Sequence, residues 1–222
     1  GLAGDALTDA DYNVAVGTSA LGADTLGSRA VAIGRNALQA QNFTTATNNY
    51  NVGVGFAAGT AITTGTLNTL VGGLAGDALT TGNNNVAFGY EALSADTLGD
   101  RNVAIGTQAL KTQNFTTTTD SYNVAVGFTA GASITTGIDN VLIGGLTGDA
   151  LTTGNENIAI GRSALGSETK GNSTVAIGHG ALDAQNFTTA TDTYNVAVGR
   201  SAGGAVTTGT LNTLIGGLAG DE

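Results

Sequence analysis

The 222-residue sequence contains no proline, cysteine, methionine or tryptophan. Without cysteine the chain cannot form disulfides or thiolate metal sites. The lack of proline favours a structure in which every residue of a β-ladder must donate its N–H. Charged residues make up only 11%, while 41% of residues are hydrophobic. Because disorder requires low hydrophobicity and high charge, this composition predicts a folded chain.

Positive charge is scarce. The sequence has seven lysines and arginines against seventeen acidic residues, for a net charge of −10. The basic residues are spread singly along the sequence, whereas recognition of phosphate requires clustered positive charge, so we expect no nucleic-acid partner. The acidity also disfavours anionic membrane surfaces. No apolar run approaches the ~20 residues that span a bilayer, so we expect no membrane insertion of this segment.

Glycine is abundant, with 36 residues, and it marks a repeat. The phrase NVAVG at residues 13–17 recurs twelve times with variation, at intervals of 17 residues interrupted by intervals of 21. The full cycle is 72 residues, which divides one continuous solenoid (residues 1–222) into super-repeats 1–72, 73–144 and 145–216 with a tail at 217–222. The phrase GLAGD both opens and closes the chain, and we interpret the chain as an excerpt from a longer protein. The closing glycines are Gly17, Gly34, Gly55, Gly72, Gly89, Gly106, Gly127, Gly144, Gly161, Gly178, Gly199 and Gly216.

A 17-residue unit is too short for a pair of helices and fits one turn of a β-solenoid, with short strands between glycine turns. The predicted fold class is therefore all-β, a parallel β-solenoid or β-roll of about 12 turns with 17 or 21 residues per turn. Two columns support the stacking. Asparagine precedes the strand in ten of the twelve turns, where stacked amides can bond along the stack. Threonine follows the glycine by eight residues in every regular interval.

The strand residues indicate two apolar faces. Alternate residues share a face, so pairs such as Val14 and Val16 are expected to fill the interior. The residue between them is then expected to face outward as a small apolar surface that needs a partner. We interpret this column as the subunit interface of a homotrimer around an axis; the alternative is a monomer with a bland outer face. The candidate interface residues are Ala15, Ala32, Leu70, Ala87, Ala104, Ala125, Leu142, Ala159, Ala176, Ala197 and Leu214.

Each 21-residue turn carries four extra residues and a heptapeptide of the form QNFTTAT. Such an insertion is expected to project from one edge of the solenoid. Its aromatic and polar residues predict a surface that binds a glycan or a protein. In the alternative interpretation the phenylalanine folds inward and plugs the widened turn against Tyr50, Tyr122 or Tyr194. The candidate binding residues are Asn42, Phe43, Thr44, Asn114, Phe115, Thr116, Asn186, Phe187 and Thr188.

Residues for catalysis are lacking. His179 is the only histidine, and Arg35 and Thr107 occupy equivalent places in other turns, which suits an exposed turn position. A nucleophile needs a positioned base, and none is evident. We therefore expect no catalytic residues, no metal site and no cofactor.

Residues 102–106 (NVAIG), followed by Ala109, Leu110 and glycine turns, resemble the head repeats of trimeric autotransporter adhesins. The turns are also similar to NTAxG-type repeats of bacteriophage tail fibres. The adhesin resemblance implies a trimer of left-handed parallel β-rolls and extends over the whole chain. The adhesin unit is shorter than 17 residues, so the handedness and trimer packing do not transfer. Nothing in the chain matches a membrane anchor or a coiled-coil stalk.

These observations predict a non-enzymatic, rigid segment of an extracellular fibre, on a cell surface or a virion. Its expected role is adhesin-like, with attachment to a cell or host through a surface glycan or protein receptor. The alternative is a purely structural shaft or surface filament that has no binding site of its own.

Overall fold

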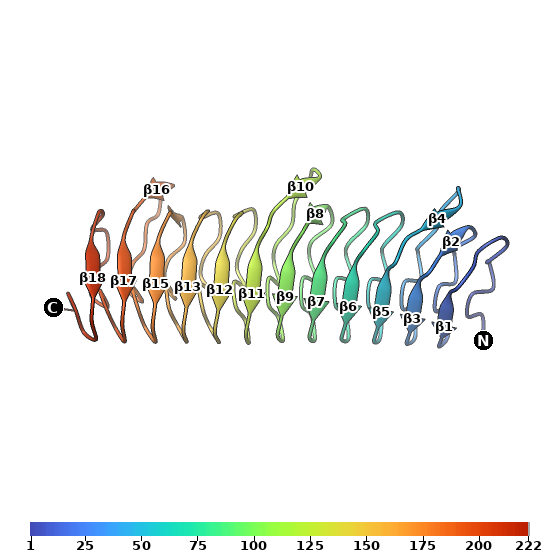
Figure 1. The fold of residues 1–222 in the computed structure, drawn as a ribbon, viewed down its shortest axis with the longest axis horizontal. Coiled ribbons are helices and arrows are strands. Elements are labelled where there is room, and N and C mark those ends of the chain that lie inside the picture. Colours follow the sequence, from blue (N-terminus) through green and yellow to red (C-terminus); the bar gives the residue numbers. More distant parts are fainter. Residues whose placement is uncertain (222) are drawn as a thin grey trace. The chain divides into compact units, whose positions relative to one another are not determined.

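The computed structural model describes residues 1–221 and contains two compact units. The first consists of residues 1–107 and 114–120, and the second of residues 108–113 and 121–222. Each unit is a parallel β-solenoid with six turns, so the chain has about twelve turns (Figure 1). No residue from 1 to 221 is helical. The predicted fold class is therefore confirmed, and the single continuous solenoid stays a prediction.

Every turn contributes one three-residue strand to a parallel sheet, and each 21-residue turn and the turn before it add a two-residue strand. In the first unit the sheet strands are β1 (Val14–Val16), β3 (Val31–Ile33), β5 (Val52–Val54), β6 (Thr69–Val71), β7 (Val86–Phe88) and β9 (Val103–Ile105). Its short pairs are β2 (Gly27–Ser28) with β4 (Thr47–Asn48), and β8 (Gly99–Asp100) with β10 (Thr119–Asp120).

The second unit repeats this arrangement. Its sheet strands are β11 (Val124–Val126), β12 (Val141–Ile143), β13 (Ile158–Ile160), β15 (Val175–Ile177), β17 (Val196–Val198) and β18 (Thr213–Ile215). Its short pair is β14 (Gly171–Asn172) with β16 (Thr191–Asp192).

The turns are aligned in register, so equivalent residues lie side by side. Val14 pairs with Val31, for example, and the Val14 N–H donates to the Ala30 carbonyl at 2.9 Å. The ladder also continues outside the strands, because the Leu21 N–H donates to the Ala37 carbonyl at 3.0 Å. Backbone groups at the corners are thereby paired with the neighbouring turn, as buried backbone requires.

The corners use an uncommon backbone conformation. Thirty residues other than glycine have φ between 44° and 67°, the left-handed region. One lies two residues before the sheet strand, as Arg29 does before β3. Another lies two residues after the glycine that follows the strand, as Asn36 does after Gly34. An L-residue in this region costs about 1–2 kcal/mol. The corners are therefore held by the ladder between turns rather than by local preference.

The interior is narrow and is filled by the middle residue of each strand. Nine of the eleven candidate interface residues have no exposed surface; Ala15 and Leu214, in the first and last turns, are partly exposed. The flanking residues instead point outward, as Val16 and Phe88 do with 56% and 55% of their surface exposed. The predicted direction of the two strand faces is therefore wrong. Alanine and leucine line the inside, and the β-branched residues lie outside.

A small residue at one interior position of a turn is compensated by a larger residue at another interior position of the same turn. Many turns carry a buried leucine at the second corner, such as Leu38, but some have glycine there, such as Gly59. A Cβ atom on Gly59 would lie 2.7 Å from Leu70 Cδ1 and 2.9 Å from Leu38 Cδ2. The missing volume is supplied by Ile62, three residues later and fully buried. Close-packed interiors require such matching of volumes.

The asparagine column forms the expected ladder. The Asn68 N–H donates to Asn51 Oδ1 at 3.0 Å, and Asn68 Nδ2 donates to the Gly82 carbonyl at 2.8 Å. Threonine side chains also join neighbouring turns, since Thr63 Oγ1 donates to the Thr80 carbonyl at 3.2 Å. Both columns therefore stabilise the stack.

Substitution of the glycine that follows a sheet strand tests whether the stability of the fold depends on the close stacking of neighbouring turns. Gly72 has φ of 137°, and a Cβ there would lie 2.6 Å from the Gly89 carbonyl carbon. We expect Gly72→Ala to lower the free energy of unfolding by about 2–4 kcal/mol, measured by urea denaturation. The matched control is Gly73→Ala, whose Cβ would make an ordinary 3.5 Å contact with Tyr90. Equal denaturation midpoints for the two variants would contradict the close-stacking explanation.

Candidate functional site

The three long turns extend further from the main sheet than the regular turns beside them (Figure 1). Within them the phenylalanines are buried, with only 6%, 6% and 8% of the surface of Phe43, Phe115 and Phe187 exposed. The asparagine and threonine on either side of each phenylalanine are exposed. The structure therefore favours the interpretation in which phenylalanine fills the widened turn, and it leaves the asparagines and threonines as the surface.

The tyrosines that follow the phenylalanines lie at the surface. Tyr50, Tyr122 and Tyr194 keep about half of their surface exposed, at 49%, 49% and 56%. In the first unit Arg29 lies between two tyrosines, with its guanidinium carbon 4.9 Å from the ring centroid of Tyr12 and 5.8 Å from that of Tyr50. Its Nε donates to Asn48 Oδ1 at 3.1 Å. This cation–π contact fastens the end of the long turn to the turn before it.

A buried carboxylate holds the first long turn. Asp24 lies in the preceding turn and has no exposed surface. Its Oδ1 accepts the backbone N–H groups of Gly27 at 3.0 Å and Phe43 at 3.1 Å, and its Oδ2 accepts Gln41 Nε2 at 2.6 Å. Gln41 Oε1 in turn accepts Asn51 Nδ2 at 2.8 Å. This chain of hydrogen bonds fixes the backbone on which Phe43 sits.

The third long turn uses glutamate for the same purpose. Glu168 Oε1 accepts the N–H groups of Thr169, Gly171 and Phe187 at 2.9, 2.7 and 3.0 Å. Its Oε2 accepts Gln185 Nε2 at 2.9 Å. Such a set of convergent N–H groups is an anion-binding nest, occupied here by the protein's own carboxylate. Because the carboxylate is buried and its oxygens are in use, it is a structural group.

Sequence reasoning missed this polar cluster, although a pattern for it was present. In each super-repeat an acidic residue precedes the glutamine of the heptapeptide by 17 residues, at Asp24, Asp96 and Glu168. Equivalent places in other turns hold apolar residues such as Ile62 and Leu79. A charged residue in an otherwise apolar column indicates a buried hydrogen-bond partner.

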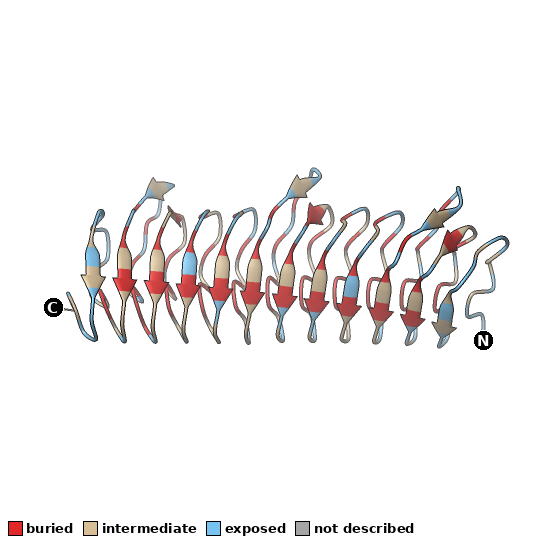
Figure 2. Cartoon of the chain, in the orientation of Figure 1, coloured by how far each residue is buried: buried red, intermediate tan, exposed pale blue. Residues whose placement is uncertain are grey.

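The outward face of each sheet is apolar and uncharged. Figure 2 shows that the middle of the strands is buried while their ends are partly exposed. Of the 24 outward strand positions, 22 hold valine, isoleucine or phenylalanine, and Thr69 and Thr213 occupy the other two. Each unit therefore presents roughly 300 Å² of sheet face, comparable to the largest apolar patch on a typical monomer.

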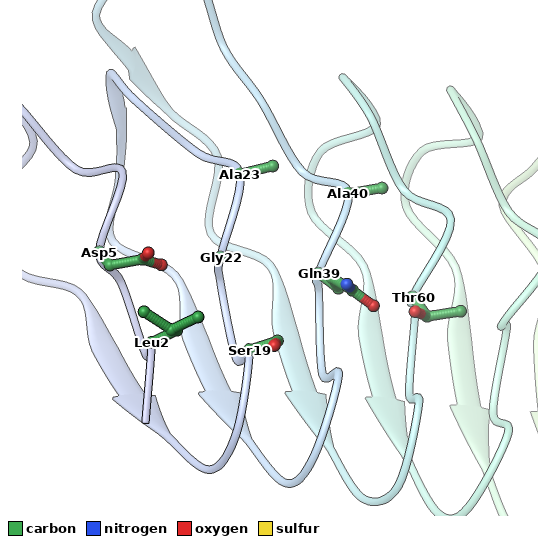
Figure 3. A pocket seen from close by; sticks show the side chains of 8 residues that line it. All are labelled: Leu2, Asp5, Ser19, Gly22, Ala23, Gln39, Ala40 and Thr60. Carbon is green, nitrogen blue, oxygen red and sulfur yellow. The ribbon is translucent and has the colours of Figure 1, made fainter.

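The first unit also has a shallow surface hollow of about 340 Å³ near its N-terminal turns (Figure 3). Figure 3 places Asp5, Ser19, Gln39 and Thr60 along the corners of successive turns, with Leu2 beside them. These side chains vary from turn to turn and do not converge on a common point (Figure 3). The hollow therefore offers no defined set of ligand-binding groups.

Two carboxyl groups on the corners are perturbed. Burial raises the pKa of Asp77, and the nearby Glu91 raises it further. Burial likewise raises the pKa of Asp149, with a smaller contribution from Asp183. Neither aspartate belongs to a larger cluster, since residues 1–221 contain no group of three or more histidine, cysteine or acidic side chains able to hold a metal ion. His179 is exposed.

Within residues 1–221 there is no helix of the length and hydropathy needed to cross a membrane. Comparison of the chain with protein-family models, curated proteins and solved structures found no match.

The buried phenylalanines provide a test of the packing interpretation. We expect Phe115→Ser to lower the free energy of unfolding by about 2–4 kcal/mol, because it leaves a cavity in the widened turn. Thr116→Ser, at the exposed neighbouring position, is the matched control and should change it by less than about 0.5 kcal/mol. Thermal or urea unfolding followed by circular dichroism measures both. An unchanged free energy of unfolding for Phe115→Ser would contradict the packing interpretation and indicate that the phenylalanine lies at the surface.

Proposed function

We propose that the chain is a non-enzymatic, rigid segment of an extracellular or virion fibre that mediates adhesin-like attachment to a cell or host surface. The observation that carries the proposal is the uniform stack of turns, in which the hydrogen-bonding side chains of the interior serve the stack itself. A repeat in which every turn packs on its neighbours makes an extended support for regularly spaced surface turns. The resemblance to adhesin heads and tail-fibre repeats agrees with this role.

The attachment surface that we propose is the exposed part of the long turns. Asn42 and Thr44 and their equivalents flank the buried phenylalanines and recur once in every 72 residues. Polar side chains on loops held by a rigid support are typical of binding sites. A cell-surface glycan or protein receptor is the class of partner that suits exposed amide and hydroxyl groups.

A triple variant tests this surface. We expect Thr44→Ala, Thr116→Ala and Thr188→Ala together to lower binding to a glycan array or to cultured cells at least fivefold. The matched control replaces Thr64, Thr81 and Thr136 with alanine; these threonines are exposed on regular turns. If the wild-type protein binds none of the surfaces, the second candidate function, a structural shaft without a binding site, is favoured.

We further propose that the chain forms a homotrimer, now through the outward valine and isoleucine face in place of the alanine column. This face exposes Phe88 in the first unit and Ile143 in the second and carries no charge in either unit, whereas the alanines are enclosed in the turns. Burial of exposed apolar area at a subunit interface stabilises the association by roughly 25 cal/mol per Å². A flat, repeated face on each chain suits a closed symmetric assembly.

Light scattering on the purified protein tests the assembly. We expect a molar mass of three times 21.7 kDa. Phe88→Lys combined with Ile143→Lys should reduce it to 21.7 kDa, because a buried lysine at an interface is strongly unfavourable. Thr64→Lys with Thr136→Lys, on exposed corners, should leave the mass unchanged. A wild-type mass of 21.7 kDa would contradict the trimer and leave the outward face free.

A further inference from the structure

Three nitrogen-bearing side chains occupy the same place in three consecutive turns of the second unit. Arg162, His179 and Arg200 each follow the last residue of a sheet strand by two positions, after β13, β15 and β17 respectively. All three are exposed. This unit therefore carries a column of cationic and N–H-donating groups, each directly after a closing glycine. We call it the Arg–His–Arg column.

Backbone contacts establish that the column is aligned. The parallel pairing of β13, β15 and β17 is in register. Beyond the strands the Gly180 N–H donates to the Arg162 carbonyl at 3.0 Å, and the Ser201 N–H donates to the His179 carbonyl at 2.9 Å. The three residues thus start from backbone positions one strand spacing apart, ~4.8 Å.

The neighbouring column adds hydroxyl groups and an opening. Ser163, Gly180 and Ser201 follow the three residues of the Arg–His–Arg column. A Cβ on Gly180 would have one neighbouring atom within 4 Å, Ser201 Oγ at 3.6 Å. Gly180 itself is buried, and its lack of a side chain leaves room between the serines of the flanking turns.

The column has no counterion of its own. Within residues 1–221 none of the three side chains makes an ion pair or a hydrogen bond. Arg162 and Arg200 lie two turns apart with His179 between them, so the two arginines make no favourable contact with each other and folding does not explain their alignment. In the other nine turns this place holds Thr18, Arg35, Phe56, Gly73, Tyr90, Thr107, Phe128, Gly145 and Gly217. An aligned set of exposed cationic and N–H-donating groups with no intramolecular partner is available to bind an anion.

We propose that the Arg–His–Arg column binds an oxyanion, the sulfate or carboxylate group of a glycan. A guanidinium presents paired N–H donors that match the two oxygens of such a group, and the imidazole and the serine hydroxyls add further donors. The net charge of −10 opposes the approach of a long polyanion such as a nucleic acid, whereas a single oxyanion on a short glycan meets only the column. The site lies outside the long turns and does not depend on the attachment proposed for them.

The single histidine provides a direct measurement. Because His179 is the only histidine, the imidazole proton resonances in an NMR spectrum report on the column alone. We expect these resonances to shift on titration with inorganic sulfate and, at lower concentration, with a sulfated disaccharide. The matching unsulfated disaccharide should leave them in place. Equal shifts with both sugars, or none with any probe, would overturn the proposal.

Variants assign the binding to the column. We expect Arg162→Gln combined with Arg200→Gln to weaken binding of the sulfated disaccharide at least tenfold, since each loses charge-assisted hydrogen bonds. Arg35→Gln, at the equivalent place in the first unit, is the matched control and should bind as the wild type does. If Arg35→Gln loses as much affinity as the double variant, general charge attraction explains the binding and the site is refuted.

A third variant closes the opening over Gly180. Leu146 occupies the equivalent corner of the same unit with φ of 58°, so Gly180→Leu is compatible with the fold. We expect Gly180→Leu to reduce binding at least fivefold while its circular dichroism spectrum and melting temperature stay near those of the wild type. Unchanged affinity in the folded variant would contradict the role of the opening. Tighter binding of a single-stranded oligonucleotide than of the sulfated disaccharide would overturn the choice of a glycan.

Discussion

The structure depends on the hydrogen-bond ladder between successive turns. One turn of 17 residues encloses only a few small side chains and has no core of its own, so its stability comes from the turn on either side. The ladder requires a short distance between turns, and that distance explains several features at once. The column of closing glycines allows carbonyl groups to approach where a Cβ would collide. The left-handed corners, unfavourable for isolated residues, persist because their N–H groups are paired across turns.

The ladder also determines how the chain accommodates polar groups and insertions. Asparagine amides inside the stack form hydrogen bonds with the neighbouring turn. The buried polar column therefore stabilises the alignment of the turns and avoids the free-energy cost of unpaired polar groups. Four extra residues would disturb the stack unless their backbone groups found partners. Asp24 and Glu168 supply those partners from the preceding turn, and the phenylalanine fills the added space. The long turn is thus a built part of the repeat. Its exposed threonines and the Nδ2 groups of its asparagines remain for other contacts, since Asn42 Oδ1 accepts Thr25 Oγ1 at 3.1 Å.

The alanine and leucine face of the strands lies inside, opposite to the expectation from the sequence. This changes which surface we propose as the subunit interface. Alanine inside leaves valine, isoleucine and phenylalanine outside, so the surface available to a second copy is larger and more apolar than an alanine column would be. Beyond one edge of this face lie the corners that carry the Arg–His–Arg column. The second unit therefore presents three kinds of surface: an apolar sheet face, a polar long turn and a short cationic column.

The sequence by itself determined the repeat, its period, the parallel solenoid and the asparagine ladder. Because equivalent residues recur at regular intervals, stacked turns place them side by side in one register. It also indicated which strand residues share a face, since side chains alternate along a strand. Only the tertiary structure decided which face is inside. Both faces are apolar in the sequence, and the choice follows from the narrow interior, where Ala32 fits beside the corner leucines and a β-branched residue on every turn does not. The alignment of Arg162, His179 and Arg200 follows from the repeat, since each residue directly follows a closing glycine, and the backbone pairing of the turns confirms it.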